Sequence, residues 1–186
     1  MKETFELSTG EKIIFRHIKR SDLNAVWRNF NEVVEEDIYP VFFPVETQFE
    51  KESWYDSLKK EQNICIVADN LELKEPNNVV GQCEISNVEW DASKHVGSLG
   101  IIVQKQFRDM GIGRRLMDMA IRESKNLNNK EKIILSCFSN NQRAIHLYKK
   151  FGFKEVGVRK AQFKIEGEYY NELLMELFIE DYLEGQ

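Results

Sequence analysis

Hydrophobic positions along the chain follow two periods, one typical of strands and one typical of helices. The first apolar run, residues 12–16, is short and rich in Ile and Phe, which predicts a strand. From Leu23 onward, apolar residues recur at helical spacing through Val26, Trp27 and Phe30. The same reading predicts strands at about 12–16, 64–68, 79–85, 95–103, 132–137, 153–164 and 169–179, and helices at about 23–34, 47–58, 111–124 and 141–150.

The order of these elements is β-α-α-β-β-β-α-β-α-β-β. Runs of adjacent strands mixed with a few helices are typical of the α+β class. We therefore expect one mostly antiparallel, twisted sheet of about seven strands, flanked by four helices. With 186 residues and no repeat or linker, residues 1–186 are expected to form a single domain.

Composition narrows the functional classes. Hydrophobic residues make up 42% and charged residues 31% of the chain, as in ordinary globular proteins. The net charge of −5 argues against a general nucleic-acid binder and favours cationic substrates. No 18-residue apolar run and no apolar signal region at the N-terminus are present, so we expect no membrane association.

The cysteines and histidines point to no metal centre. Cys65, Cys83 and Cys137 each lie in an apolar run, are odd in number and lack CxxC spacing. They are expected to be reduced core residues of a cytoplasmic protein. The three histidines are far apart and have no closely spaced partner, so no metal is expected.

The stretch 101–117 carries the first candidate for chemistry. An apolar run ends in a polar turn, and Arg108-Asp109-Met110-Gly111-Ile112-Gly113 then opens a helix. Unpaired N–H groups at a helix N-terminus bind phosphate, and glycine allows close approach and positive φ. Leu116 replaces the third glycine of a dinucleotide fingerprint, and Gly-Lys-Ser/Thr is absent. Taken alone, an ordinary turn with glycine caps explains the loop equally well.

The remaining pattern, Arg-x-x-Gly-x-Gly, resembles the acetyl-CoA pyrophosphate loop of the GNAT superfamily of N-acetyltransferases. A second segment, from Asn141 through Tyr148 to Phe153, resembles the GNAT helix whose Asn and Tyr border the pantetheine arm. Asn141 alone could be a helix cap, and Tyr148 alone a packing residue. Two motifs in the family's order, with a strand between them, identify the chain as a member of the superfamily.

The resemblance implies the GNAT fold and an acetyl-CoA-dependent N-acetyltransferase. The acetyl group would move directly to a primary amine in a ternary complex; the acceptor would be a small amine, a polyamine, an amino-acid-like compound or a protein N-terminus. A non-catalytic acyl-CoA-binding regulatory module of the same fold is the alternative. A homodimer is common in the family. Acetyl-CoA, the only cofactor expected, would contact Ile101, Ile102, Val103, Arg108, Asp109, Met110, Gly111, Ile112, Gly113, Arg114, Asn141 and Tyr148.

Acetyl transfer requires a neutral amine, although a lysine-type amine has a pKa of roughly 10.4. A base must accept the proton, and a proton donor helps the CoA thiolate to leave. The resemblance assigns the donor role to Tyr148. Several family members carry a Glu thirteen residues before the loop arginine, where this chain has His95. We take His95 as the first candidate base, since its ordinary pKa suits neutral pH, and Glu84 as the reserve.

The acceptor is expected to bind between the acidic end of the first helix and the last two strands. Glu32 and Glu36, with Tyr39, could receive a cationic amine, and Tyr170 could line the same pocket. A solvated acidic loop and ordinary alternating packing explain these residues as well.

Overall fold

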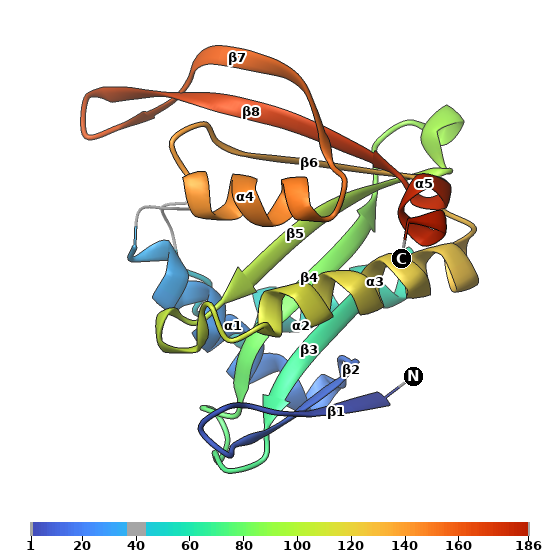
Figure 1. Cartoon of the computed structure of the whole chain (residues 1–186). Coiled ribbons are helices and arrows are strands. Elements are labelled where there is room, and N and C mark those ends of the chain that lie inside the picture. Colours follow the sequence, from blue (N-terminus) through green and yellow to red (C-terminus); the bar gives the residue numbers. More distant parts are fainter. Residues whose placement is uncertain (1, 37–43, 186) are drawn as a thin grey trace.

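The computed structural model describes residues 2–36 and 44–185 (Figure 1). Its strands are β1 (Lys2–Glu6), β2 (Lys12–His17), β3 (Ile64–Asn70), β4 (Val79–Asn87), β5 (Val96–Val103), β6 (Lys132–Phe138), β7 (Lys154–Ile165) and β8 (Glu168–Phe178). Its α-helices are α1 (Leu23–Val34), α2 (Gln48–Lys60), α3 (Ile112–Asn128), α4 (Gln142–Lys150) and α5 (Ile179–Glu184). Three short 3-10 turns, Arg20–Asp22, Asp91–Ser93 and Lys105–Phe107, connect them.

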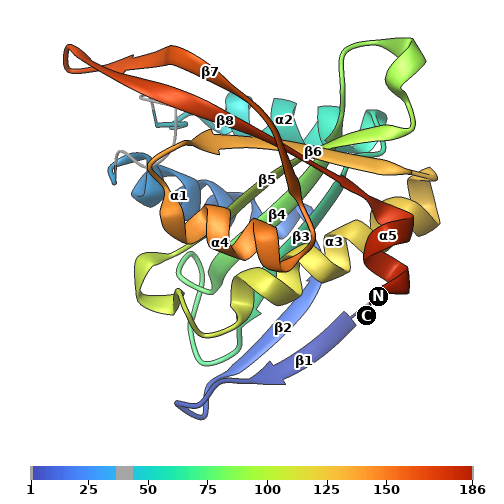
Figure 2. The same cartoon turned by 45° about the horizontal axis from the view of Figure 1, so that its top comes forward.

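One sheet contains all the described strands, in the order β1-β2-β3-β4-β5-β6-β8-β7. Every neighbouring pair is antiparallel except β5 and β6, which are parallel. This confirms the predicted α+β class and the mostly antiparallel sheet. The β7–β8 hairpin extends beyond the rest of the molecule (Figure 2).

Helices cover both faces of the sheet and bury two apolar clusters. The larger cluster joins the sheet to α3 and α4, and includes Leu116, Ile133 and Tyr148. The smaller cluster joins the other face to α1 and α2, through residues such as Val26 and Leu58. Strand alternation explains the division, because neighbouring residues such as Cys65 and Ile66 fall into different clusters.

The sheet opens between β5 and β6. Their parallel register contains only Val96–Ser98 paired with Lys132–Ile134. The remainder of β5, from Leu99 to Val103, continues to pair with β4, and the remainder of β6 continues to pair with β8. The two strands therefore separate toward their C-terminal ends. This opening is the structural feature on which the site depends.

Two elements were missed by the sequence pattern. The N-terminal strand β1 alternates between exposed and half-buried residues only, so it has no apolar run to reveal it. The short helix α5 follows β8 directly; the expected last strand ended at about Ile179, and no helix was predicted after it. In addition, α3 continues to Asn128, four residues beyond the expected end, and stops at Asn129 in a left-handed conformation (φ 52°). No helix in the described residues is long and apolar enough to cross a membrane.

Gly97 provides a test of the β5–β6 contact. A Cβ on Gly97 would lie 2.5 Å from Ile85 Cγ2 and 3.1 Å from Ile133 Cδ1. Because these neighbours are fully buried, Gly97→Ala is expected to lower the free energy of unfolding by about 1–3 kcal/mol. Gly157→Ala is the matched control, since a Cβ there meets nothing within 4 Å, and its effect should stay within about 0.5 kcal/mol. Urea unfolding would measure both; equal values would contradict the close approach.

Candidate active site in the opening between β5 and β6

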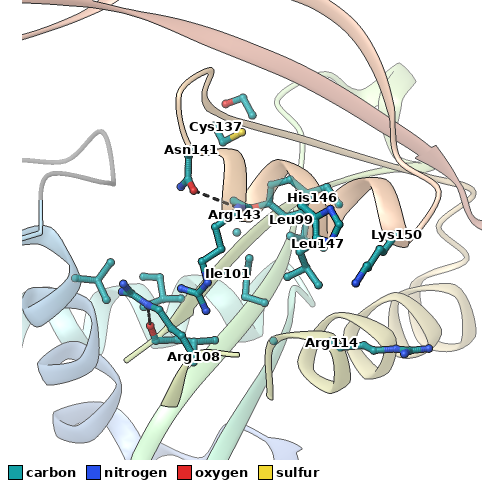
Figure 3. Close-up of a pocket in the computed structure, with 18 of the residues that line it drawn as sticks. Leu99, Ile101, Arg108, Arg114, Cys137, Asn141, Arg143, His146, Leu147 and Lys150 are labelled. Carbon is teal, nitrogen blue, oxygen red and sulfur yellow. Dashed lines mark hydrogen bonds between the residues drawn. The ribbon is translucent and has the colours of Figure 1, made fainter. Parts of the chain in front are cut away.

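A cavity of about 760 Å³ occupies the opening between β5 and β6 (Figure 3). Residues from β4, β5, the loop before α3, β6 and α4 line it. All the residues expected to contact acetyl-CoA are among them except Met110 and Ile112. The side chain of Ile112 is buried in the core, and that of Met110 is partly buried against it.

The loop before α3 has the geometry expected of an anion-binding turn. Gly111 is the N-cap of α3 and has a φ of 83°, a conformation that favours glycine. The first N–H groups of α3 have no partners within the helix and carry the positive end of its dipole. A Cβ on Gly113 would lie 3.5 Å from Leu147 and 3.7 Å from Ile101, and both of these residues line the cavity. Glycine at 113 therefore leaves space between α3 and α4.

Arg108 is held in place by other residues of the protein. Its Nη1 and Nη2 donate to the two carboxylate oxygens of Glu36, each at 2.6 Å. Its Nε donates to the carbonyl oxygen of Val103 at 2.8 Å (Figure 3). The three nitrogens of the guanidinium thus already donate to other groups of the protein. In this arrangement the Arg108 side chain is not free for the direct phosphate contact that the resemblance implied.

Helix α4 presents both expected and unexpected residues to the cavity. Asn141 caps the helix, because its Oδ1 accepts from Ala144 N at 3.2 Å, and it also lines the cavity. Tyr148 is 7% exposed and packs against Phe153, with ring centroids 5.9 Å apart. Arg143 and Lys150, together with Leu147, project from α4 toward β5 and α3 (Figure 3). None of these three was expected from the sequence, although their i, i+4, i+7 spacing places them on one helix face.

Glu84 reaches the cavity from the face of the sheet that α1 and α2 cover. It lies opposite Gly100 in the β4–β5 register, while its neighbours Cys83 and Ile85 point into the large core cluster. Burial raises the pKa of Glu84 to about 7, an effect that a hydrogen bond from Trp54 partly offsets and the negative charge of Glu61 increases. Strand alternation turns Glu84 away from this core cluster, and the separation of β5 and β6 gives it access to the cavity.

His95 lies outside the cavity lining. It is exposed, at the turn immediately before β5, and its carbonyl oxygen accepts hydrogen bonds from the N–H groups of Glu131 and Lys132. These bonds place it at the closed end of the β5–β6 pair, whereas the cavity begins at Ser98. The residue thirteen positions before Arg108 therefore lies at the paired end of β5 and does not line the cavity.

The expected acceptor residues are only partly brought together. Glu32 forms an ion pair with Arg28, and Glu36 with Arg108. Tyr39 lies outside the described residues. Tyr170 packs edge-on against Phe138, which lines the cavity, with centroids 5.6 Å apart. The two acidic residues are therefore already paired with arginines of this chain.

The cavity also contains one cysteine. Cys137 of β6 is half-buried, and burial raises the pKa of its thiol to about 11. In the described part of the chain, no group of three or more His, Cys, Asp or Glu side chains is arranged to hold a metal ion.

Known proteins share both the sequence pattern and the fold. The family model "Acetyltransferase (GNAT) family" matches residues 29–153. An N-alpha-acetyltransferase of Sulfolobus acidocaldarius is 33% identical over 75% of this chain and 79% of its own length. The spermidine N(1)-acetyltransferase of Escherichia coli is 25% identical over 95% of this chain and 91% of its own.

A Salmonella typhimurium structure determined with its cofactor acetyl-CoA aligns with a TM-score of 0.79 and 18% identity, covering 90% of this chain and 94% of that one. A ribosomal-protein-alanine N-acetyltransferase structure from Brucella melitensis aligns with a TM-score of 0.78 and 22% identity, over 88% and 98% of the two chains. These two likenesses concern the fold. Together with the match of the family model to most of the chain, they lead to one conclusion: this chain belongs to the GNAT family of acetyltransferases.

Proposed function

We propose that this acetyl-CoA-dependent N-acetyltransferase moves the acetyl group directly to the neutral amine of its acceptor, with Glu84 as the base and Tyr148 as the proton donor. One observation carries the proposal: Glu84, from the α1–α2 face, and Tyr148, from the α4 face, line the same cavity. The separation of β5 and β6 connects the two faces. Acetyl-CoA would enter from the side of α3 and α4, and the amine from the side of α1 and α2.

Glu84 suits the removal of a proton from an ammonium group. A carboxyl with a pKa of about 7 is substantially ionised at neutral pH and remains a stronger base than an ordinary carboxylate. A hydrogen bond from the nearby indole of Trp54 stabilises the ionised carboxylate and so limits the rise of its pKa. Transfer of the proton, directly or through a water molecule, leaves the amine lone pair free to attack the thioester carbonyl.

Two further groups would stabilise the later steps. The tetrahedral intermediate carries an oxyanion, which backbone N–H groups can stabilise. Gly100–Val103 lies along the part of β5 that has no partner in the β6 register, so this backbone borders the cavity. Tyr148 would donate its hydroxyl proton to the leaving thiolate of CoA. The N–C bond forms when the amine attacks the carbonyl, and the thioester C–S bond breaks when the tetrahedral intermediate collapses and releases the CoA thiolate.

The cofactor phosphates would meet the N-terminus of α3 and several side-chain cations. Arg114, Arg143 and Lys150 line the cavity and remain at least partly solvent-exposed. Arg143 also forms an ion pair with Asp109, between Nε and Oδ1 at 3.1 Å. These positive charges would attract the polyanionic part of acetyl-CoA to the open side of the cavity.

Direct transfer is favoured over an acyl-enzyme. The reactive form of cysteine is the thiolate. A pKa of about 11 keeps Cys137, the cysteine that lines the cavity, protonated at neutral pH. Burial raises the pKa of Cys83 as well.

A primary amine is the proposed acceptor class, and we propose the cytoplasm, a reducing compartment suited to three free cysteines, as the location. The relatives include enzymes named for protein N-termini and for spermidine. Thiol release from acetyl-CoA, measured with N-terminal peptides beside spermidine and free amino acids, would separate these acceptors. Binding of acetyl-CoA without thiol release for any amine would instead favour the non-catalytic module.

Tyr148→Phe tests the proton donor. The substitution keeps the ring and its packing against Phe153 but removes the hydroxyl, so kcat should fall by roughly 10²-fold while the KM for acetyl-CoA changes little. Tyr182→Phe is the matched control, because it removes a hydroxyl that bonds Asp118 away from the cavity. Steady-state kinetics would measure both. Full activity of Tyr148→Phe at every pH would refute the assignment.

Glu84→Gln tests the base through the pH profile. A base with a raised pKa loses activity as the pH falls, so kcat/KM of the native enzyme should contain a step near pH 7. Glu84→Gln should lack that step and be much slower, whereas ionisation of the amine acts equally on both enzymes. Because the folded-state pKa exceeds the ordinary value, ionised Glu84 lowers stability above pH 7, and Glu84→Gln should be the more stable protein at pH 8.

The neighbouring Glu61 offers a second check on the same group. Its negative charge contributes to the raised pKa of Glu84, so Glu61→Gln should move the step to lower pH without removing it. A pH step that persists unchanged in Glu84→Gln would assign the base to another residue.

A further inference from the structure

The ion pair between Glu36 and Arg108 joins two segments that are far apart in sequence. Glu36 lies just beyond the end of α1, and Arg108 opens the loop before α3. The pair is bidentate, with both distances 2.6 Å, and the side chains are only 13% (Arg108) and 21% (Glu36) exposed. Bidentate pairing of a guanidinium with a carboxylate fixes orientation as well as charge. Arg108 is thereby bonded to the segment that follows α1 and, through its Nε, to Val103 at the end of β5.

This pairing changes what Arg108 can contribute to cofactor binding. A guanidinium neutralised by a carboxylate adds little net positive charge at the loop. Arg114, Arg143 and Lys150 also lie along the cavity, and none of them forms such a bidentate ion pair within the described residues. The conformation of the loop is therefore the contribution that Arg108 is placed to make.

The loop itself needs external support. Asp109, the residue after Arg108, has a φ of 62°, which is uncommon for a residue with a side chain and persists where neighbouring structure holds it. Arg108 is anchored by Glu36 and Val103 on one side, and Asp109 is paired with Arg143 of α4 on the other. Gly111 then turns the chain into α3 at a φ of 83°. The positions of the α3 N–H groups follow from these anchors.

We propose that Glu36 is a positioning residue for the cofactor loop: by holding Arg108, it sets the position of the N–H groups at the start of α3 that bind the pyrophosphate of acetyl-CoA. The inference rests on the proposed function, since it takes that loop as the pyrophosphate site. It replaces the expectation that Glu36 receives the cationic amine. It also links α1, whose Val33 lines the cavity, to the affinity for the cofactor.

Glu36→Gln tests the proposal, because glutamine keeps the size of the side chain and removes the charge. Isothermal titration with acetyl-CoA should show about a 10-fold weaker Kd, with kcat at saturating acetyl-CoA changed by less than about 3-fold. Glu35→Gln, the same change at the adjacent exposed position, is the control and should leave the Kd unchanged. A Kd for Glu36→Gln equal to or tighter than that of the native protein would overturn the proposal, as would a raised acceptor KM with an unchanged Kd.

Reversing the pair separates positioning from general stability. Arg108→Glu and Glu36→Arg should each weaken acetyl-CoA binding, and the double variant should bind more tightly than either single variant, because the ion pair can re-form with its partners exchanged, whereas the hydrogen bond from Arg108 Nε to Val103 O stays lost. No recovery in a double variant that is folded by circular dichroism would contradict the positioning role. If the native protein itself fails to bind acetyl-CoA, the proposed function fails; if it binds and transfers but Glu36→Gln matches it, only this inference fails.

Discussion

The structure depends on one interruption in a hydrogen-bond ladder. Strands β5 and β6 pair over three residues each and then separate, while each keeps its partner on the other side. A separated pair exposes backbone N–H and C=O groups that a closed sheet would satisfy internally, which is unfavourable unless another molecule or water bonds them. In the proposed function the acetyl-CoA arm and the acceptor would occupy that space, so the opening would hold both substrates.

The opening also connects two different electrostatic environments. On the α3–α4 side, a helix N-terminus and exposed arginine and lysine side chains suit a polyanionic cofactor. On the α1–α2 side, Glu84 is buried beside Trp54 and its pKa is raised. Keeping a carboxylate in that environment destabilises the folded protein at neutral pH, and the same burial makes it a better base. Stability would thus be reduced at the position where the proposed mechanism places its base.

The carboxylates near the cavity differ in whether an arginine pairs with them. Glu36 and Glu32 form ion pairs with Arg108 and Arg28, so these two carboxylates are not free to bind a cationic amine. Glu84 has a hydrogen bond from the Trp54 indole and forms no ion pair within the described residues, and burial raises its pKa. Pairing with an arginine stabilises the ionised form of a carboxyl and makes it a weaker base. The uncharged partner of Glu84 is therefore consistent with the role of a base.

The sequence by itself determined the local features: the alternation of strands and helices, the glycine turn at 111, the Asn141 cap and the two motifs that identify the family. These depend on residues close together along the chain. The tertiary structure decided which side chains share the cavity. It placed His95 at the closed end of β5, gave Glu84 access through the opening, and joined Glu36 to Arg108, 72 positions away. Such choices follow from strand register and from the crossing of distant elements, and single-sequence patterns contain neither.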